Sequence, residues 1–352
     1  MYDDMSGLIS YSGLTTKVRA IRGKMLKQEQ FLELADCESV AEVIGYLKET
    51  DAYRELFSSV NSEAIHRGNI EKLLKRCYYS DFEKLYRFSD MEQRKYLELY
   101  FKKFELSFLK SCLRNICRTN SEDRSDREVT TLFQRHSKLD AVVLQSETTI
   151  EGFVEKLKNT EYYAPLKRVI MGDRHTLFDY EAALDMYYFT KFWKEKKKSF
   201  KGTDAKVLDR AFGYKIDILN MQWIYRSKRF YQLSKADIYA LLIPIRYRLT
   251  KKDIERMVEA TDAQTFQSGI GQTAYKKMYP DISGENLEDM YIYLLDGIHD
   301  NDGHKHPYSV AILNSYLYRK EYEINKITTI MECIRYKVSK NDTIHYARLD
   351  EG

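Results

Sequence analysis

The stretch that decides the fold occurs twice in the chain. It reads VAEVIGYLKETDAYREL at residues 40–56 and IEGFVEKLKNTEYYAPL at residues 150–166, an offset of 150 − 40 = 110 residues. The offset pairs like residues without a gap: Leu47 with Leu157, Thr50 with Thr160, Tyr53 with Tyr163 and Leu56 with Leu166. Such self-similarity at a fixed spacing is typical of an architecture built from repeated units.

The repeat extends beyond these two stretches. The same offset joins Glu71 with Glu181, Leu74 with Leu184, Tyr78 with Tyr188 and Phe82 with Phe192. A weaker third copy lies 222 residues after the first, where Ala274-Tyr275 matches Ala52-Tyr53 and Met278 matches Leu56. We therefore predict three helical domains, at residues 1–120, 121–232 and 233–352, called here the first, second and third copy. Three such copies indicate a body about a pseudo-threefold axis or a short array, and favour a scaffold over an enzyme.

The periodicity within each copy is helical. Val40, Val43, Ile44 and Leu47 fall on one helix face. Capping-box patterns predict helix starts at Ser39 with Glu42, Thr148 with Glu151, and Thr261 with Gln264. Longer helices are predicted at about residues 90–118, 204–230 and 308–337, and the polar stretch 119–127 is predicted to be a linker. The expected fold is all-α.

The composition narrows the class of protein. The net charge is +4, from 57 basic and 53 acidic residues, so nothing favours a nucleic-acid partner. The longest apolar run, about residues 239–245, is far shorter than the roughly 18 residues of a membrane span. The start of the chain has no secretion signal, and the five cysteines form no CxxC pair, which is typical of free thiols in a reducing compartment.

Three stretches are candidate sites of chemistry. Gly269–Ala274 matches the GxGxxG/A string, but a dinucleotide site needs that string between a strand and a helix, so a turn between two helices is the better interpretation. Residues 299–306 gather His299, His304 and His306 with two aspartates, which could bind a divalent metal but also suit an exposed turn. The basic run 194–201 could touch anionic lipid or an acidic partner, or could simply end a helix in solvent. We predict no cofactor, no metal and no catalytic residue.

The last predicted helix carries the most recognisable motifs. They are Pro307, Tyr316-Leu317, Lys320-Glu321, Glu323-Ile324 and Asn325-Lys326-Ile327. These motifs, with Tyr11 and Lys17-Val18-Arg19-Ala20 near the N-terminus, resemble the C subunit of archaeal and bacterial A/V-type ATPases, whose eukaryotic counterpart is the d subunit of the V-ATPase. Residues 184–189 and 220–228 are similar in kind, so the resemblance spans nearly the whole chain.

The resemblance implies a role for the whole chain. It implies an all-α funnel of three similar domains, which sits on the cytoplasmic face of the membrane rotor ring and has no active site of its own. In that role the chain receives the shaft formed by the D and F subunits and couples it to the proteolipid ring, for ATP-linked transport of H⁺ or Na⁺. Contact with the membrane would be through the ring alone, and the isolated chain would be a monomer.

The resemblance also singles out candidate partner-binding residues. Tyr316, Lys320, Glu321 and Glu323 are expected to face the shaft or the ring, or alternatively to hold the last helix against the first domain by packing and ion pairs. Two other functions stay open at this point. One is a helical adaptor for a protein outside the ATPase, and the other is a metal-dependent enzyme that uses the histidines of residues 299–306.

Overall fold

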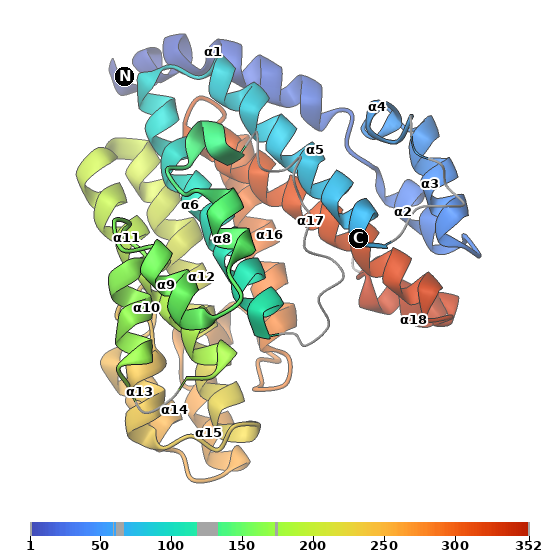
Figure 1. Cartoon of the computed structure of the whole chain (residues 1–352). Coiled ribbons are helices and arrows are strands. Elements are labelled where there is room, and N and C mark those ends of the chain that lie inside the picture. The colour runs from blue at the N-terminus through green and yellow to red at the C-terminus, as the bar shows by residue number, and fades with distance from the viewer. Residues whose placement is uncertain (1, 59, 61–66, 118–132, 173–174, 351–352) are drawn as a thin grey trace. The chain divides into compact units, whose positions relative to one another are not determined.

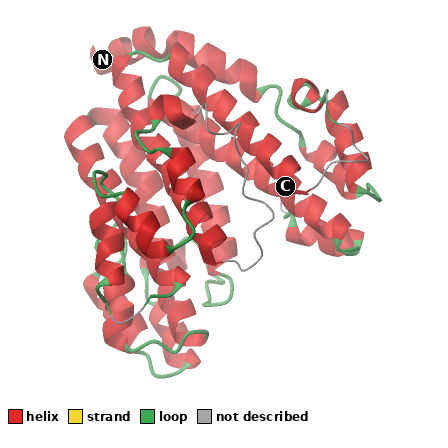
Figure 2. Ribbon diagram, in the orientation of Figure 1, coloured by secondary structure: helices red, strands yellow, loops and turns green. Residues whose placement is uncertain are grey.

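The computed structural model describes residues 2–58, 60, 67–117, 133–172 and 175–350. These residues form α-helices, one short 3₁₀ helix and connecting turns, with no β-strand among them (Figure 2). The predicted all-α fold is therefore confirmed. The predicted linker at residues 119–127 lies outside the described residues.

The chain divides into two compact units. The first contains residues 1–97, 122–137 and 312–352, and the second contains residues 98–121 and 138–311. The three predicted repeat domains follow sequence similarity rather than this division, and they stay a prediction.

The first unit is built from helices of both ends of the chain (Figure 1). Its helices are α1 (Tyr2–Arg22), α2 (Gln28–Ala35), α3 (Val40–Glu49), α4 (Arg54–Phe57), α5 (Arg67–Phe88) and α18 (Lys340–Tyr346), with most of α17 (Val310–Arg335) and the start of α6 (Met91–Cys117).

The second unit holds the remainder of α6 and the helices of the middle of the chain. These are α8 (Ala141–Ser146), α9 (Ile150–Lys156), α10 (Tyr163–Ile170), α11 (Leu177–Ser199), α12 (Gly202–Arg229), α13 (Lys235–Leu241), α14 (Lys251–Glu259), α15 (Ala263–Gly271), η1 (Ala274–Lys277) and α16 (Leu287–Lys305). The three long helices predicted from sequence are thus α6, α12 and α17.

The repeated residues are repeated because they form the core. Burial of apolar side chains is the main favourable term in folding, so equivalent core positions keep equivalent side chains. Most of the matched leucine and aromatic residues are buried, namely Leu47, Tyr53, Leu74, Tyr78, Phe82, Leu157, Leu166, Leu184, Tyr188, Phe192 and Tyr275, whereas Leu56 and Tyr163 are half-buried.

The helix starts follow the capping rules, although two predicted caps are one residue out of place. The Ser39 hydroxyl accepts from the Glu42 amide as predicted, but the cap of α9 is Thr149 and the cap of α15 is Asp262, not Thr148 and Thr261. Each of these side chains satisfies an amide in the first helical turn that has no partner within the helix. Neighbouring Thr and Asp residues offer alternative caps, and a sequence pattern alone does not choose between them.

Candidate functional site

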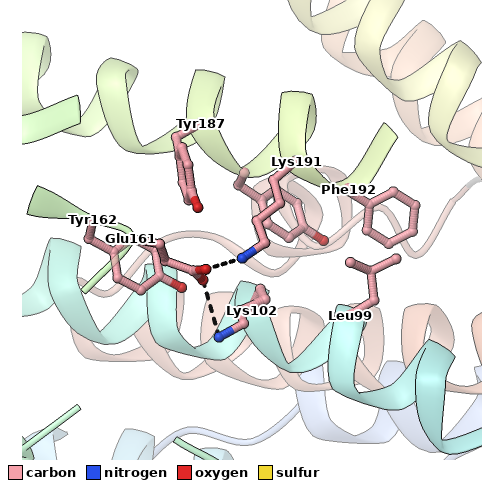
Figure 3. A pocket seen from close by; sticks show the side chains of 8 residues that line it. Leu99, Lys102, Glu161, Tyr162, Tyr187, Lys191 and Phe192 are labelled. Atoms are coloured by element: carbon pink, nitrogen blue, oxygen red, sulfur yellow. Dashed lines mark hydrogen bonds and ion pairs between the residues drawn. The ribbon is translucent and has the colours of Figure 1, made fainter. Parts of the chain in front are cut away.

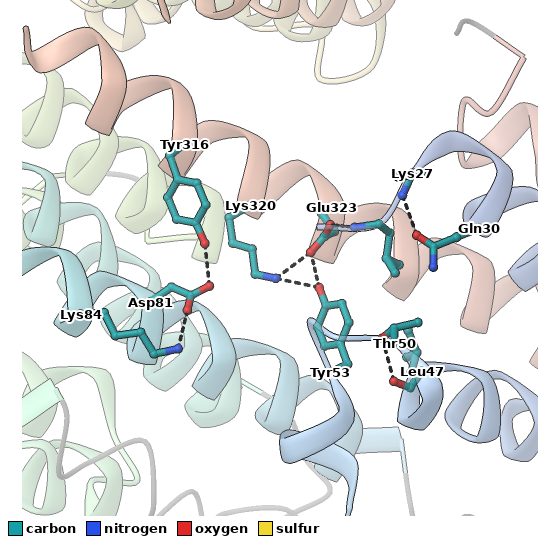
Figure 4. A network of polar contacts seen from close by, with 11 residues as sticks. Lys27, Gln30, Leu47, Thr50, Tyr53, Asp81, Lys84, Tyr316, Lys320 and Glu323 are labelled. Atoms are coloured by element: carbon teal, nitrogen blue, oxygen red, sulfur yellow. Dashed lines mark hydrogen bonds and ion pairs between the residues drawn. The ribbon is translucent and has the colours of Figure 1, made fainter. Parts of the chain in front are cut away.

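Three of the four predicted partner-binding residues are buried within the first unit. Tyr316, Lys320 and Glu323 of α17 are only 1%, 2% and 3% exposed, whereas Glu321 is half-buried. Figure 4 shows the polar contacts of the three buried side chains. These three side chains make polar contacts with the first copy, which agrees with the alternative that they hold the last helix against the first domain. Direct contact of the four residues with a partner stays a prediction.

Glu323 is the centre of this buried cluster. Its carboxylate accepts a hydrogen bond from the Tyr53 hydroxyl at 2.6 Å, from the Lys320 ammonium at 2.6 Å and from the Leu26 backbone amide at 2.7 Å. Lys320 also donates to the Tyr53 oxygen at 3.1 Å and lies 4.4 Å from the centre of the tyrosine ring. A buried carboxylate needs such donors, because removal from water disfavours its charge.

Further contacts hold α17 along its length. Tyr316 donates to the Asp81 carboxylate of α5 at 2.7 Å, and Lys84 pairs with the same carboxylate at 2.9 Å (Figure 4). The Tyr78 hydroxyl donates to the Leu317 carbonyl at 3.0 Å, which adds a further contact between α5 and α17. The first and last parts of the chain are therefore joined by polar contacts as well as by apolar packing.

The electrostatics of the cluster follow from its burial. Burial raises the pKa of the Tyr53 hydroxyl well above its ordinary value, and the charge of Glu323 raises it further. Burial is the largest single influence on the Lys320 ammonium and lowers its pKa, but the charges of Glu323 and other nearby acidic groups, with the hydrogen bond to Glu323, together outweigh it, so this pKa lies above its ordinary value. At neutral pH the cluster therefore contains a neutral tyrosine beside a charged lysine.

The second unit repeats the tyrosine–carboxylate contact. Tyr162 donates to the Glu105 carboxylate of α6 at 2.5 Å, and Lys102 donates to the same carboxylate at 2.8 Å. Lys102 and Glu105 are three residues apart, as are Lys320 and Glu323. Tyr162 precedes α10 as Tyr53 precedes α4, so Tyr162 is the counterpart of Tyr53, although the sequence offset pairs Tyr53 with Tyr163.

A third contact of the same kind lies in the second unit. Tyr275 of η1 donates to the Asp217 carboxylate of α12 at 2.9 Å. Among the described residues, no lysine contacts Asp217. Its carboxylate instead accepts hydrogen bonds from the backbone amides of residues 247, 248 and 249. Burial raises its pKa, and these hydrogen bonds act in the opposite direction.

The three contacts follow one rule along the chain. In each, a tyrosine near the start of a short helix donates to a carboxylate on the long helix that ends the preceding copy: Tyr162 to Glu105 of α6, and Tyr275 to Asp217 of α12. Tyr53 of the first copy donates instead to Glu323 of α17, which belongs to the third copy. If the third copy is counted as the one that precedes the first, the rule therefore holds for all three tyrosines.

The family is decided by a match across almost the whole chain. A model of the ATP synthase (C/AC39) subunit family matches residues 14–346. The chain belongs to the ATP synthase (C/AC39) subunit family.

Individual members of the C/AC39 family agree with this assignment. The chain is 23% identical to the C subunit of the A-type ATP synthase of Thermococcus kodakarensis, over 92% of this chain and 86% of the relative. It is 24% identical to the same subunit of Pyrococcus abyssi, over 92% and 86%, and 24% identical to that of Methanosphaera stadtmanae, over 91% and 83%. Membership identifies a structural subunit of ATP synthase rather than a catalytic one, and it implies other ATPase subunits as partners.

The other sequence candidates fall into structural roles in this C/AC39 chain. Residues 269–274 span the end of α15 and the start of η1, so both glycines lie in the last turn of a helix and do not follow a strand. Within the described part of the chain, no three His, Cys, Asp or Glu side chains are placed to hold a metal ion together. Among those same residues, no helix combines the length and apolar character needed to cross a bilayer.

The exposed turn predicted at residues 299–306 is wrong. Residues up to Lys305 continue helix α16, in which His299 and Asp302 are buried. Arg210 of α12 donates to the Asp302 carboxylate, with the Nε contact at 3.0 Å. Packing between α12 and α16 thus keeps Asp, Asn and Gly residues helical where their local preferences favour a turn.

The basic run at residues 194–201 is only partly a solvated helix end. Lys196 is buried beside the Trp193 ring, 3.6 Å from its centre, and pairs with Asp209. Burial lowers the pKa of this ammonium to about 8. Lys197, Lys198 and Lys201 are exposed around the end of α11, as expected of a helix that ends in solvent.

A small pocket in the second unit is lined by charged side chains that pair with one another. Its lining consists of Leu99, Lys102, Glu161, Tyr162, Tyr187, Tyr188, Lys191 and Phe192 (Figure 3). Glu161 lies between two lysines, with Lys102 at 3.2 Å and Lys191 also paired to it. Burial and the charge of Lys102 lower the pKa of Lys191. The pocket adjoins the Tyr162–Glu105 contact, because Lys102 pairs with both Glu161 and Glu105.

Sequence reasoning missed Glu105 and Asp217. One signal was available for Glu105, because Lys102 and Glu105 repeat the spacing of Lys320 and Glu323 in the recognised motif. Asp217 carries no such signal, since its partners are mostly backbone amides.

Proposed function

We propose that this C/AC39 chain is the non-catalytic central-stalk subunit that couples the D/F shaft to the proteolipid ring. It acts as a socket at the cytoplasmic face of the membrane, and torque passes through it between ATP chemistry and H⁺ or Na⁺ transport. The observation that carries the proposal is the family match over residues 14–346. The three predicted domains, with their pseudo-threefold relation, belong to the same proposal.

The buried tyrosine–carboxylate contacts suit this mechanical task. A coupler must transmit force without deforming, and hydrogen bonds to buried charges resist displacement more strongly than exposed pairs do. The Tyr53–Glu323 contact is especially apt, because it joins segments 270 residues apart in sequence. Loss of this contact would weaken the attachment of the last helix to the first copy, which would then depend on the remaining contacts, such as Tyr316–Asp81 and Tyr78–Leu317.

The four motif residues divide into two roles under this proposal. Tyr316, Lys320 and Glu323 position α17 from within, and act on partners only through the placement of that helix. Glu321 is half-buried on the same helix and remains a candidate for direct contact with the shaft or the ring.

Recovery of the tagged chain from its own membranes tests the function. The co-purifying subunits are identified by mass after gentle detergent extraction. Recovery of the D, F and proteolipid subunits supports the socket. Recovery of the chain with an unrelated protein, and with none of these subunits, would replace the proposal by the adaptor function.

A further inference from the structure

Helices α13 and α18 begin in the same way. Each has seven residues, and each starts with the sequence Ser-Lys-x-Asp, at residues 234–237 and 339–342. In both, the serine hydroxyl accepts the aspartate amide at 3.2 Å and donates to the aspartate carboxylate at 2.6 Å. The two helices follow the long helices α12 and α17.

The lysines of these starts make matching ion pairs. Lys235, the first residue of α13, pairs with Glu259 at the end of α14. Lys340, the first residue of α18, pairs with Asp36 at the end of α2. Helix α13 packs against α14 as α18 packs against α2. The contact between α18 and α2 in the first unit therefore resembles the contact between α13 and α14 in the second.

The buried side chains of α13 and α18 also agree. The fourth residue of α13 is Ile238 and the fourth residue of α18 is Thr343, and both are 1% exposed.

Helices α2 and α14 are themselves counterparts. The Leu26 amide before α2 donates to the Glu323 carboxylate, and the Leu249 amide before α14 donates to the Asp217 carboxylate. Four features thus match between the pair α18–α2 and the pair α13–α14. They are the serine cap, the lysine ion pair, the buried fourth residue, and the backbone amide before the second helix that donates to a buried carboxylate.

The geometry points to α18 being the first helix of the first copy: the C-terminal segment supplies there the element that α13 supplies in the third. Residues 339–349 are then a strap that closes the first copy from the other end of the chain. Gln28 of α2 also donates to the Leu349 carbonyl, which extends the strap beyond α18. This inference concerns the chain alone and does not rest on the proposed partners.

Hydrogen exchange on the full-length chain tests the strap with matched substitutions. Thr343→Lys places a charge under α18, and Ile238→Lys places the same charge under α13. We expect Thr343→Lys to speed amide exchange in α2 by at least about tenfold while α14 keeps its rate, and Ile238→Lys to do the reverse. Faster exchange in α18 alone, with α2 unchanged, would make α18 a terminal appendage and overturn the inference.

A second experiment uses gentler changes, so that the test does not depend on the folding of a disruptive variant. Lys340→Asp and Asp36→Lys each reverse one charge of a pair whose side chains are both 54% exposed. Each single change is expected to speed exchange in α2 by roughly two- to fivefold, and the double change is expected to restore the original rate. Additive effects in the double variant would contradict the pairing on which the strap rests.

Discussion

The Tyr53 hydroxyl donates a 2.6 Å hydrogen bond to the Glu323 carboxylate, and so joins the first copy of the repeat to the last long helix. Tyr162–Glu105 and Tyr275–Asp217 reproduce this relationship one copy further along the chain in each case. A family of buried contacts with one rule indicates that the carboxylate on each long helix is the point at which the next copy attaches.

Removal of the Tyr53 hydroxyl should destabilise the protein. Tyr53→Phe leaves the ring in place but takes one donor from a buried carboxylate, so the free energy of unfolding should fall by about 1–3 kcal/mol. Urea denaturation measures the loss. Tyr46→Phe is the matched control, because Tyr46 donates to Glu33 at the surface and its loss should cost less than about 0.5 kcal/mol. Equal losses in the two variants would contradict the importance of the buried contact.

The three tyrosines should not be equally important. Asp217 keeps three backbone amide donors, which the fold holds in place, when the Tyr275 hydroxyl is removed. Lys102, which donates to Glu105, is by contrast a flexible side chain that can move away when Tyr162 is changed. Tyr275→Phe is therefore expected to cost less than Tyr162→Phe, with both within about 1–3 kcal/mol. Comparison of the two urea midpoints checks the order, and a larger loss for Tyr275→Phe would refute it.

Lys320 should be more sensitive than any surface lysine. Lys320→Met removes the cation and leaves Glu323 buried with one charge uncompensated, which should cost about 3–5 kcal/mol. A second change, Glu323→Gln, removes that charge and should restore part of the stability. Thermal unfolding of the single and double variants measures both effects. A double variant less stable than Lys320→Met would show that the pair is not the source of the loss.

Alkaline pH should open the tyrosine contacts. Burial raises the pKa of Tyr162 above its ordinary value, so the folded state holds this proton more tightly than the unfolded state does. The resulting stability is complete below about pH 10 and is lost as the pH rises further, by up to about 1.4 kcal/mol per pH unit.

Urea denaturation at several alkaline pH values measures this slope. Tyr162→Phe should flatten the decline relative to the natural chain, whereas Tyr163→Phe, at the neighbouring half-buried position, should leave it unchanged. The same slope in all three proteins would show that Tyr162 does not contribute to the alkaline transition.

Glu321 should matter for assembly and not for folding. Charge reversal in Glu321→Lys is expected to lower the recovery of partner subunits in the membrane pull-down by about tenfold or more. The free energy of unfolding is expected to change by less than about 0.5 kcal/mol. Glu92→Lys at the exposed start of α6 is the matched charge-reversal control. Undiminished recovery with Glu321→Lys would exclude it as a partner contact.

The sequence was informative where the signal is local or repeated. The 110-residue offset identified core positions such as Leu47 and Leu157 because packing demands the same side chain in each copy. Caps such as Thr149 were missed by one residue, since neighbouring polar side chains compete locally.

The contacts between distant segments could not be predicted in this way. Glu323 meets Tyr53 across 270 residues, and no periodicity reports which carboxylate a tyrosine will reach. The exposed turn at His299 was wrong for a related reason, because packing of α16 against α12 overrides the turn preference of the Asp, Asn and Gly neighbours. The resemblance singled out four residues on α17, and the burial of three of them became visible only in the structure.

The most direct test of the socket is reconstitution of the D and F subunits with ring-containing membranes, in the presence and absence of this chain. If the chain couples the shaft to the ring, D and F should sediment with the membranes only when it is added. Equal binding of D and F without the chain, or binding of the chain to neither the shaft nor the ring, would contradict the account.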